Sequence, residues 1–355
     1  MQITIVGGGN IGTQFAAHCA FKGHDVIVYT SKFANFSNNI EIIDENYKTI
    51  LNGIIKEATY DSKTAFNRAD LIFITTPAFC MDKIAKEIKT HAKKNVIIGL
   101  IPGTGGGECA FNEFKKVFGL QRVPSVSRVT AEGRQVRSVG YRNELHVSAI
   151  PRAYTEECCR IIENIFDIKT TPINGYLNLT LTPSNPILHT TRLYSMFKDY
   201  KKEFYYEKEP LFYEDWTDDA SEWLFKCDNE VQNLCKSLKQ FNLEYVKSLK
   251  THYESDSPEK LTKKIKSING FKGIKTPMTA KDKGFIPDFN SRYFTADFPY
   301  GLAIIKQIAD FAMADIPNIN IIWEWYLNIS GNKDYFNYSN YGIFNINDLA
   351  DFYLK

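Results

Sequence analysis

The chain has 355 residues, of which 44% are hydrophobic and 24% are charged, and its formal net charge is +2. The length favours two domains, and the composition is ordinary for a globular protein. The small net charge argues against nucleic acid as a partner, and no apolar run approaches the roughly 20 residues of a membrane-spanning helix. The chain starts on a strand pattern without a leader segment, so we expect a cytoplasmic protein.

The seven cysteines are an odd number and lie scattered along the chain. None shows the paired spacing of a metal site, and the adjacent Cys158 and Cys159 would form a strained disulfide. We therefore expect free thiols, as in a reducing compartment, and no metal site.

The first half alternates between strand and helix patterns. Strands are predicted at Gln2–Val6, Asp25–Thr30, Ala69–Thr75 and Asn95–Ile101, with helices at Asn10–Lys22, Cys80–Ala92 and Thr155–Phe166. Shorter strands are predicted within Ile40–Tyr60, with a turn at Asn52-Gly53, and two or three more between Val123 and Ile173. Alternating strands and helices of this kind predict a parallel, doubly wound sheet of the Rossmann type.

After residue 182 the pattern becomes helical and rich in aromatic residues. Thr217–Phe241 has apolar residues at helical spacing, and Thr217 is a suitable N-cap. A Lys- and Gly-rich loop, Gly270–Asn290, interrupts this half and is too long to be only a connector. We therefore predict an α/β Rossmann domain over residues 1–182, followed by an all-α substrate domain over residues 183–355.

A glycine fingerprint joins the first predicted strand to the first predicted helix. Gly7 ends the strand, Gly9 permits close approach of a pyrophosphate, and Gly12 lets the helix pack on the sheet. The free N–H groups at the start of the helix favour an anion. These features predict a nicotinamide-dinucleotide site, whose residues also include Asn10, Ile11, Thr76 and Pro77.

The residues that follow the second strand bear on which cofactor binds. An Asp or Glu there would bind the ribose hydroxyls and repel a 2′-phosphate, but this chain has Thr30, Ser31 and Lys32. Two hydroxyls and an ammonium suit a phosphate, so the sequence favours NADP over NAD. A merely solvated Lys32 is the alternative, and NAD stays open.

A second glycine-rich turn, Pro102–Gly107, precedes a predicted helix. It either approaches the nicotinamide or a substrate carboxylate, or it is a tight turn without ligand contact. The sequence leaves both readings open.

His189 is the histidine best placed for acid/base chemistry. It follows Asn185, a suitable N-cap, and Pro186, a suitable first helical residue. Arg192 lies three residues later on nearly the same helix face. The structural alternatives are a packed histidine, an arginine in an ion pair and an Asn185 that only caps its helix.

A second segment follows the long loop and enters an apolar helix. It contains Arg292, Tyr293 and Asp297. A carboxylate hydrogen-bonded to a histidine fixes the tautomer of the ring and prepares it as a general acid. The structural alternative for Asp297 is a helix cap. Guanidinium groups match carboxylates bidentately, so Arg292 and Arg192 are candidate substrate ligands, as are Tyr293 and Asn185.

At these residues the chain resembles the opine dehydrogenase family, the octopine/nopaline dehydrogenase group. The resemblance spans nearly the whole chain and rests on Gly7–Gly12, Pro102–Gly107, Asn185–His189, Phe212–Thr217 with Asp228 and Glu230, and Arg292–Leu302. One departure is Ala296, where the family usually has a second acidic residue. Asp297 is then the only carboxylate of that motif.

The resemblance implies reductive condensation of an amino acid with an α-keto acid, in which His189 and Asp297 form the catalytic pair. An imine would form in the cleft between the domains and accept a hydride. Alternatives are a glycerol 3-phosphate or ketopantoate type of dehydrogenase, which relies on a catalytic lysine, and a nicotinamide-sensing protein without turnover. The aromatic-rich helical half offers a surface for a homodimer.

Overall fold

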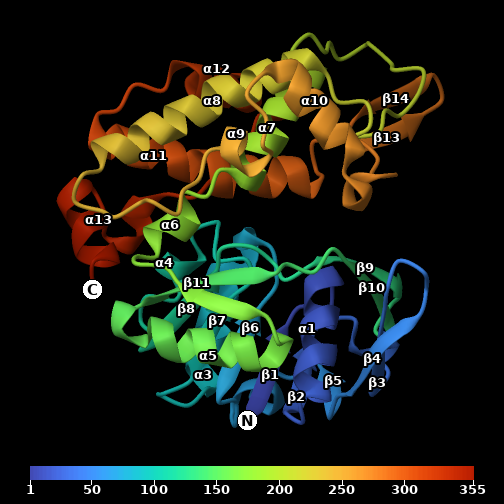
Figure 1. Cartoon of the computed structure of the whole chain (residues 1–355), viewed down its shortest axis with the longest axis vertical. Helices are drawn as coiled ribbons and strands as arrows, with labels where there is room; N and C mark the ends of the chain where they lie inside the picture. The colour runs from blue at the N-terminus through green and yellow to red at the C-terminus, as the bar shows by residue number, and fades with distance from the viewer. The chain divides into compact units, whose positions relative to one another are not determined.

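The computed structural model describes residues 1–355, which divide into two compact units (Figure 1). Unit 1 comprises Met1–Thr180 and Asp351–Lys355, and unit 2 comprises Leu181–Ala350. The sequence places the whole C-terminus in the second domain, but the last residues group with unit 1. The Lys355 carbonyl, for example, accepts the Arg152 N–H of unit 1 at 3.0 Å.

Unit 1 is built on an eight-stranded sheet in the order β12-β11-β8-β7-β6-β1-β2-β5. The strands are β1 (Gln2–Val6), β2 (Asp25–Tyr29), β5 (Glu57–Thr59), β6 (Leu71–Ile74), β7 (Ile97–Leu100), β8 (Lys116–Leu120), β11 (Glu144–Ile150) and β12 (Lys169–Pro172). All neighbours pair in parallel except β11 and β8. This parallel sheet confirms the predicted Rossmann-type architecture.

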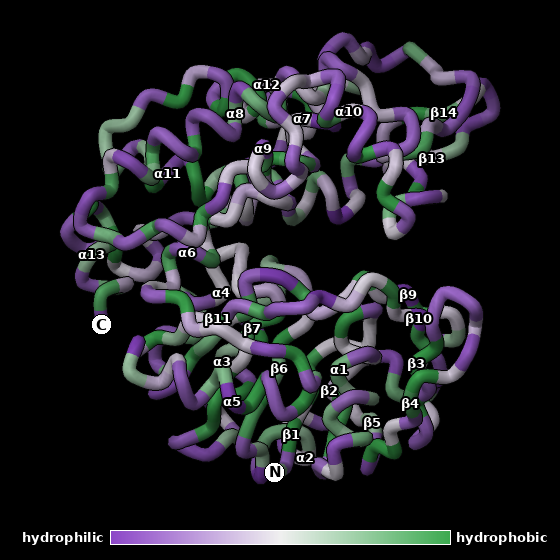
Figure 2. Tube along the Cα trace, in the orientation of Figure 1, coloured by the Kyte–Doolittle hydropathy of each residue, from purple (hydrophilic) through white to green (hydrophobic).

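The central strands are apolar because helices cover both faces of a doubly wound sheet. Every residue of β6 is buried, and Figure 2 shows the apolar stretches along β1, β2 and β6. The helices of unit 1 are α1 (Asn10–Phe21), α2 (Ser62–Phe66), α3 (Met81–His91), α4 (Gly107–Ala110), α5 (Thr155–Phe166) and α6 (Leu177–Thr180). Phe15 of α1 meets Phe73 of β6 edge-on, with ring centroids 5.1 Å apart.

A second sheet, in the order β4-β3-β10-β9, was not predicted from the sequence. Its strands are β3 (Asn39–Ile43), β4 (Thr49–Ile54), β9 (Val126–Ala131) and β10 (Gln135–Val139). The predicted turn at Asn52-Gly53 is wrong, because both residues lie within β4. Gly53 serves close packing instead: a Cβ there would overlap the backbone of Ala17 in α1.

The strand count was also underestimated: β9, β10, β11 and β12 all fall between Val123 and Ile173, where two or three strands were predicted. Strand β8 was missed as well. These strands are short and pair with segments distant in sequence, so local patterns mark them weakly.

Unit 2 is mainly helical. Its helices are α7 (Ser184–Phe197), α8 (Asp218–Ser237), α9 (Leu249–His252), α10 (Pro258–Ser267), α11 (Ala303–Ala312), α12 (Pro317–Ser330) and the start of α13 (Ile346–Tyr353). The predicted cap of α8 is confirmed, since Thr217 Oγ1 accepts the Ala220 N–H at 3.2 Å. No helix is long and apolar enough to cross a membrane.

Two features of unit 2 go beyond the predicted helices. The loop Gly270–Asn290 contains an antiparallel hairpin of β13 (Met278–Lys281) and β14 (Gly284–Pro287). The segment Tyr293–Leu302 is a π-helix that includes Pro299 and runs directly into α11. Insertions of π-helix are rare and occur often at functional sites.

Candidate active site

The glycine loop between β1 and α1 has the geometry that a dinucleotide pyrophosphate requires. Gly7 has φ +107°, a conformation that side-chain-bearing residues rarely adopt. A Cβ on Gly12 would overlap the Gly7 carbonyl oxygen, whereas a Cβ on Gly9 would meet no atom within 4 Å. The loop is therefore tight on its inner side and open at Gly9, so these residues fit a nicotinamide dinucleotide.

The other predicted cofactor residues of this region have different surroundings. The Asn10 side-chain oxygen accepts the Val129 N–H of β9 at 2.8 Å, so this side chain ties the glycine loop to the second sheet. Ile11 is half-buried against the core. Thr76 lies at the end of β6 and its hydroxyl is buried without a hydrogen-bond partner, and Pro77 follows it half-buried.

Thr75, the residue before Thr76, was expected at the same ligand-binding edge of the sheet but was not among the predicted cofactor residues. Its hydroxyl donates to the Val6 carbonyl at 2.8 Å. This bond joins the end of β6 to the end of β1, directly before the glycine loop. The orphaned Thr76 hydroxyl beside it is a polar group that a bound cofactor would satisfy.

At the end of β2, Thr30 is buried, whereas Ser31 and Lys32 are exposed. Lys32 Nζ lies 2.5 Å from Glu132 Oε1, and the other carboxylate oxygen accepts the Asn35 amide at 2.6 Å. Hydrogen bonds from Lys32 and Asn35 lower the pKa of Glu132. Lys32 is thus paired with a carboxylate that sequence reasoning missed, because Glu132 comes from the turn between β9 and β10.

The second cluster lies in unit 2 around His189, on α7. Asp297 Oδ2 lies 2.8 Å from His189 Nδ1, and both side chains are mostly buried, with 18% and 12% of their surfaces exposed. Asp297 comes from the π-helix Tyr293–Leu302, so it is no helix cap. Two segments more than 100 residues apart thus meet in one histidine–carboxylate pair, as the sequence predicted.

The other ring nitrogen of His189 is also engaged. Its Nε2 lies 2.9 Å from the hydroxyl oxygen of Tyr213. Tyr213 belongs to the Phe212–Thr217 motif, but sequence reasoning gave its side chain no role. The loop before α8 has no regular period, so no pattern pointed to this contact.

Tyr293 also packs on His189. The two rings meet edge-on with centroids 4.8 Å apart. Arg292, at the entry to the π-helix, is exposed, and no ion pair involves its guanidinium. The structure thus brings Tyr293 to the His189–Asp297 pair and leaves Arg292 accessible to solvent.

The predicted start of α7 is corrected by the structure. The helix begins at Ser184 with Pro183 at the N-cap position, and no side chain caps it. Asn185 is therefore inside the first turn and exposed. Pro186 is tolerated one residue later, because first-turn N–H groups have no partner within the helix.

Arg192 does not have the environment of a substrate ligand. Only 2% of its surface is exposed. Its Nε donates to the Phe212 carbonyl at 3.0 Å and its Nη2 to the Asp215 carbonyl at 2.7 Å. Burial lowers the pKa of Arg192 to about 10. The guanidinium anchors the loop that carries Tyr213 and forms no ion pair, so the ion-pair alternative does not describe this residue either.

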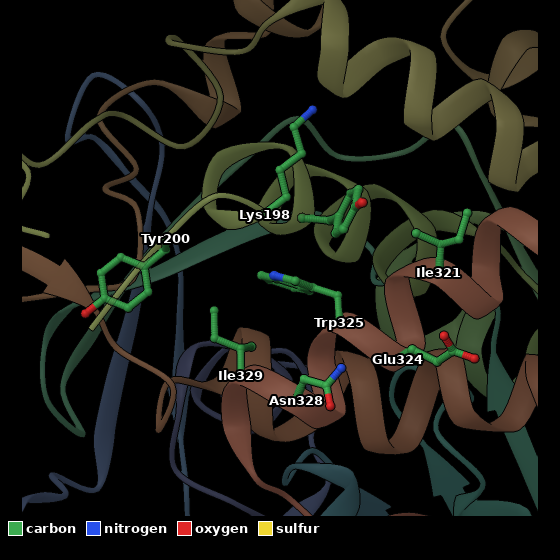
Figure 3. A pocket seen from close by; sticks show the side chains of 8 residues that line it. Lys198, Tyr200, Ile321, Glu324, Trp325, Asn328 and Ile329 are labelled. Atoms are coloured by element: carbon green, nitrogen blue, oxygen red, sulfur yellow. The ribbon is translucent and has the colours of Figure 1, made fainter. Parts of the chain in front are cut away.

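A surface hollow of about 450 Å³ lies elsewhere in unit 2 (Figure 3). Its wall includes Tyr194 of α7 and Trp325 and Ile329 of α12. Tyr194 follows His189 by five positions, which places it roughly 140° further around the helix. The hollow is therefore on a different face of α7 from the histidine.

The described residues contain no group of three or more His, Cys, Asp or Glu side chains that could hold a metal ion. All seven cysteines are free thiols, as predicted. The second glycine turn has Gly105 and Gly106 at positive φ and leads into the short helix α4. Its geometry accounts for the glycines as a tight turn, and ligand contact there stays a prediction.

Comparison with known proteins agrees with this two-part arrangement. Residues 2–109 match the N-terminus of NAD-dependent glycerol-3-phosphate dehydrogenase, and residues 172–330 match the NAD/NADP octopine/nopaline dehydrogenase alpha-helical domain. Tauropine dehydrogenase of Arabella iricolor is 25% identical, and the alignment covers 79% of this chain and 76% of the relative. Octopine dehydrogenase of Pecten maximus is 23% identical over 76% of this chain and 72% of its own length.

Solved structures show the same fold. Octopine dehydrogenase with NADH and L-arginine superposes with a TM-score of 0.83 at 20% identity, covering 99% of this chain and 98% of that one. NADP⁺-bound yersinopine dehydrogenase has a TM-score of 0.67 at 9% identity, covering 99% and 97%. The Rossmann unit and the helical unit together define an NAD(P)-dependent oxidoreductase.

The family model and the relatives indicate a narrower group than NAD(P)-dependent oxidoreductases in general. The helical domain model is that of octopine/nopaline dehydrogenases, and tauropine and octopine dehydrogenase align along 79% and 76% of the chain. In both comparisons the chain is therefore similar to the opine dehydrogenases, which are oxidoreductases acting on CH–NH donors.

Proposed function

We propose that the chain is an opine dehydrogenase that condenses an amino acid with an α-keto acid and reduces the resulting imine. The observation that carries this proposal is the His189–Asp297 pair, with 2.8 Å between Nδ1 and Oδ2, inside the helical unit. Octopine dehydrogenase has been solved with NADH together with L-arginine, agmatine or pyruvate. These ligands support an amine and a keto acid as the substrate classes here.

His189 supplies the acid/base capacity of the reaction. The ammonium group of the amino acid loses two protons, one before and one after nitrogen bonds to the carbonyl carbon, and the former carbonyl oxygen gains two protons and leaves as water. His189 takes up and returns these protons, a role worth on the order of a hundred- to ten-thousandfold in rate. Asp297 accepts the Nδ1–H, which fixes the tautomer and stabilises the protonated ring.

The dinucleotide would be held by Gly7, Gly9, Gly12 and the first N–H groups of α1, with Thr76 and Pro77 at the end of β6. Bound nicotinamide supplies the hydride that reduces the imine carbon to the secondary amine. The open space at Gly9 and the unpartnered Thr76 hydroxyl support this placement.

Arg292, Tyr293 and Asn185 are the residues we propose for substrate contact. Arg292 is exposed and without an ion pair, as a ligand for a carboxylate should be. Tyr293 touches the His189 ring and would lie against the reacting groups. Arg192 is left out of the proposed set because its guanidinium is committed to backbone carbonyls.

For the cofactor we propose NADP. Lys32, with the hydroxyls of Thr30 and Ser31, would hold the 2′-phosphate. Glu132 is the specific observation in favour of NAD as a second candidate, since a carboxylate 2.5 Å from the ammonium repels a phosphate and can accept from ribose hydroxyls. NADP binding then requires Lys32 to exchange Glu132 for the phosphate.

The test is a grid of amino acids and α-keto acids in which oxidation of NADPH, and separately of NADH, is followed by absorbance. We expect turnover only when both organic substrates are present. Oxidation with a keto substrate alone would favour the glycerol 3-phosphate or ketopantoate type of chemistry. Tight cofactor binding without turnover on any pair would favour a nicotinamide sensor.

The variant that tests the assigned residue is His189→Ala. We expect kcat to fall at least a hundredfold while the cofactor Kd changes less than twofold. His91→Ala, at the partly exposed end of α3, is the matched control and should keep wild-type kcat. A fully active His189→Ala enzyme would exclude His189 as the acid/base.

A further inference from the structure

Each ring nitrogen of His189 lies within hydrogen-bonding distance of another side chain. Asp297 Oδ2 lies 2.8 Å from Nδ1, and Tyr213 Oη lies 2.9 Å from Nε2. In the neutral tautomer that Asp297 selects, Nδ1 carries the hydrogen and Nε2 is the acceptor. A proton that enters or leaves Nε2 in this arrangement passes by the tyrosine oxygen.

The position of this oxygen is fixed by aromatic packing. The Tyr213 ring stacks on Phe271, with centroids 4.1 Å apart and planes 18° apart, and meets Phe212 edge-on at 4.8 Å. Only 5% of Tyr213 is exposed. Arg192 holds the same loop through the carbonyls of Phe212 and Asp215. Moving the phenol away from His189 would disrupt this whole cluster.

A phenol hydroxyl suits both protonation states of the histidine. It donates to Nε2 when the imidazole is neutral, and it accepts from Nε2–H when the imidazole is protonated. A carboxylate or an amide carbonyl at the same place would accept only and would favour one state. The Tyr213 hydroxyl can therefore both give a proton to Nε2 of His189 and accept one from it.

We propose that Tyr213 is the group through which His189 exchanges protons with the reacting substrate. This inference rests on the proposed function and adds a proton-transferring residue to it. The amino group enters as an ammonium, and its first proton passes through the Tyr213 oxygen to Nε2. The amine that results adds to the carbonyl carbon, and a second proton moves from nitrogen to the former carbonyl oxygen, which becomes a hydroxyl. His189 then holds one proton on each nitrogen, and Asp297 remains ionised.

The return step loses water. The Tyr213 O–H bond breaks as its proton bonds to the departing hydroxyl oxygen, the carbon–oxygen bond breaks and water leaves. The Tyr213 oxygen takes the proton from Nε2–H at the same time, so the tyrosine is again neutral. The nitrogen keeps its last hydrogen, so the product is a protonated imine whose carbon accepts the hydride.

Tyr213→Phe removes the hydroxyl and keeps the stacked ring. We expect kcat to fall on the order of a hundred- to ten-thousandfold, with the Kd for NADPH changed less than twofold. Tyr326→Phe is the matched control, because Tyr326 is also a buried, stacked tyrosine whose hydroxyl is hydrogen-bonded, at 2.7 Å to Asn332. It should keep wild-type kcat.

The double variant Tyr213→Phe/His189→Ala separates a shared path from independent effects. If the two residues act in one relay, the double variant is no slower than the slower single variant. Losses that multiply would overturn the relay. A Tyr213→Phe enzyme at or above the wild-type rate, with His189→Ala inactive, would also overturn it and leave the proposed function standing. An active His189→Ala enzyme would instead remove the proposed function itself.

A second variant keeps the proposal testable if Tyr213→Phe does not fold. A 3-fluorotyrosine incorporated at position 213 keeps the size and the hydroxyl but makes the phenol more acidic. We expect the alkaline limb of the kcat–pH profile to move to lower pH, which a merely structural tyrosine would not produce. The same replacement at Tyr326 should leave the profile unchanged, and an unmoved profile for position 213 would overturn the proposal.

Discussion

The ion pair between Lys32 and Glu132 places opposite charges where we propose that the adenosine end of a dinucleotide binds. A phosphate bound there competes with Glu132 for the ammonium, whereas a ribose diol does not. We predict that Lys32→Ala raises the KM for NADPH about tenfold and the KM for NADH less than twofold, because a charge-assisted hydrogen bond is worth about 1.5–3 kcal/mol. Initial rates with each cofactor give both constants.

Glu132→Gln is the complementary variant. It frees Lys32 from its partner, so we expect the KM for NADPH to fall. Lys333→Ala, which removes an exposed lysine of unit 2, is the control and should change neither constant. If Lys32→Ala affects both cofactors equally and Glu132→Gln weakens only NADH, Glu132 reads a ribose and NAD is the cofactor.

Burial decides the role of a single residue even when its spacing is right. His189 and Arg192 lie three positions apart on α7, yet His189 meets Asp297 and Tyr213 whereas Arg192 turns to backbone carbonyls. The spacing put both residues on one face of the helix. It contained no information on which other segment covers that face.

At the scale of elements, the loop between β1 and α1 separates two uses of glycine. A methyl group on Gly12 would overlap the Gly7 carbonyl, so we expect Gly12→Ala to disrupt the loop and lower the Tm. A methyl group on Gly9 meets no protein atom, and Gly9 has an ordinary φ of −86°. We predict that Gly9→Ala keeps the wild-type Tm but weakens dinucleotide binding at least tenfold.

Thermal denaturation and a fluorescence titration with NADH and NADPH measure these two effects. Each variant serves as the control of the other, because both add one methyl group to the same loop. A Gly9→Ala protein with unchanged affinity would show that the pyrophosphate does not approach this residue.

The π-helix Tyr293–Leu302 and the β13–β14 hairpin are elements that local pattern did not predict. The π-helix places Tyr293 and Asp297 against His189, and the hairpin lies in the long loop that also carries Phe271, the stacking partner of Tyr213. Both elements depart from the all-helical structure predicted for the second domain. The π-helix carries residues that contact His189, and the hairpin lies in the same loop as Phe271. Such irregular segments are common where a site needs side chains in special positions.

At the scale of the whole molecule, the return of the C-terminus to unit 1 depends on a buried carboxylate. Glu108 Oε1 accepts the hydroxyls of Tyr353 at 2.6 Å and Thr180 at 2.5 Å, and its other oxygen has no partner. Burial raises the pKa of Glu108 despite these bonds. Because the folded pKa lies above the unfolded one, this group destabilises the fold as the pH rises from the unfolded pKa towards the folded pKa.

We predict that Tyr353→Phe lowers the free energy of unfolding of unit 1 by about 1–3 kcal/mol. The loss should be larger at pH 8 than at pH 5, because the ionised carboxylate depends most on the missing hydroxyl. Thermal denaturation at both pH values measures it, and Tyr335→Phe, at an exposed tyrosine, is the control. An equal loss at both pH values would mean that Glu108 does not ionise over this range.

The sequence alone determined those features that depend on short-range periodicity. The strands β1, β2, β6 and β7, the glycine loop and the cap of α8 each follow from residues within one turn or one strand. They lead to the Rossmann architecture and the nicotinamide class of cofactor. The motif around His189 and the motif around Asp297 also stand in the sequence, and their resemblance to one family suggested that they meet.

Only the tertiary structure decided what each of these residues touches. The second sheet, the packing role of Gly53, the partner of Lys32 and the burial of Arg192 all depend on contacts between segments far apart in the chain. Tyr213 is the clearest case: its hydroxyl reaches His189 because Phe271 and Phe212 hold its ring. Side-chain contacts of this range are set by how elements pack, which no local pattern encodes.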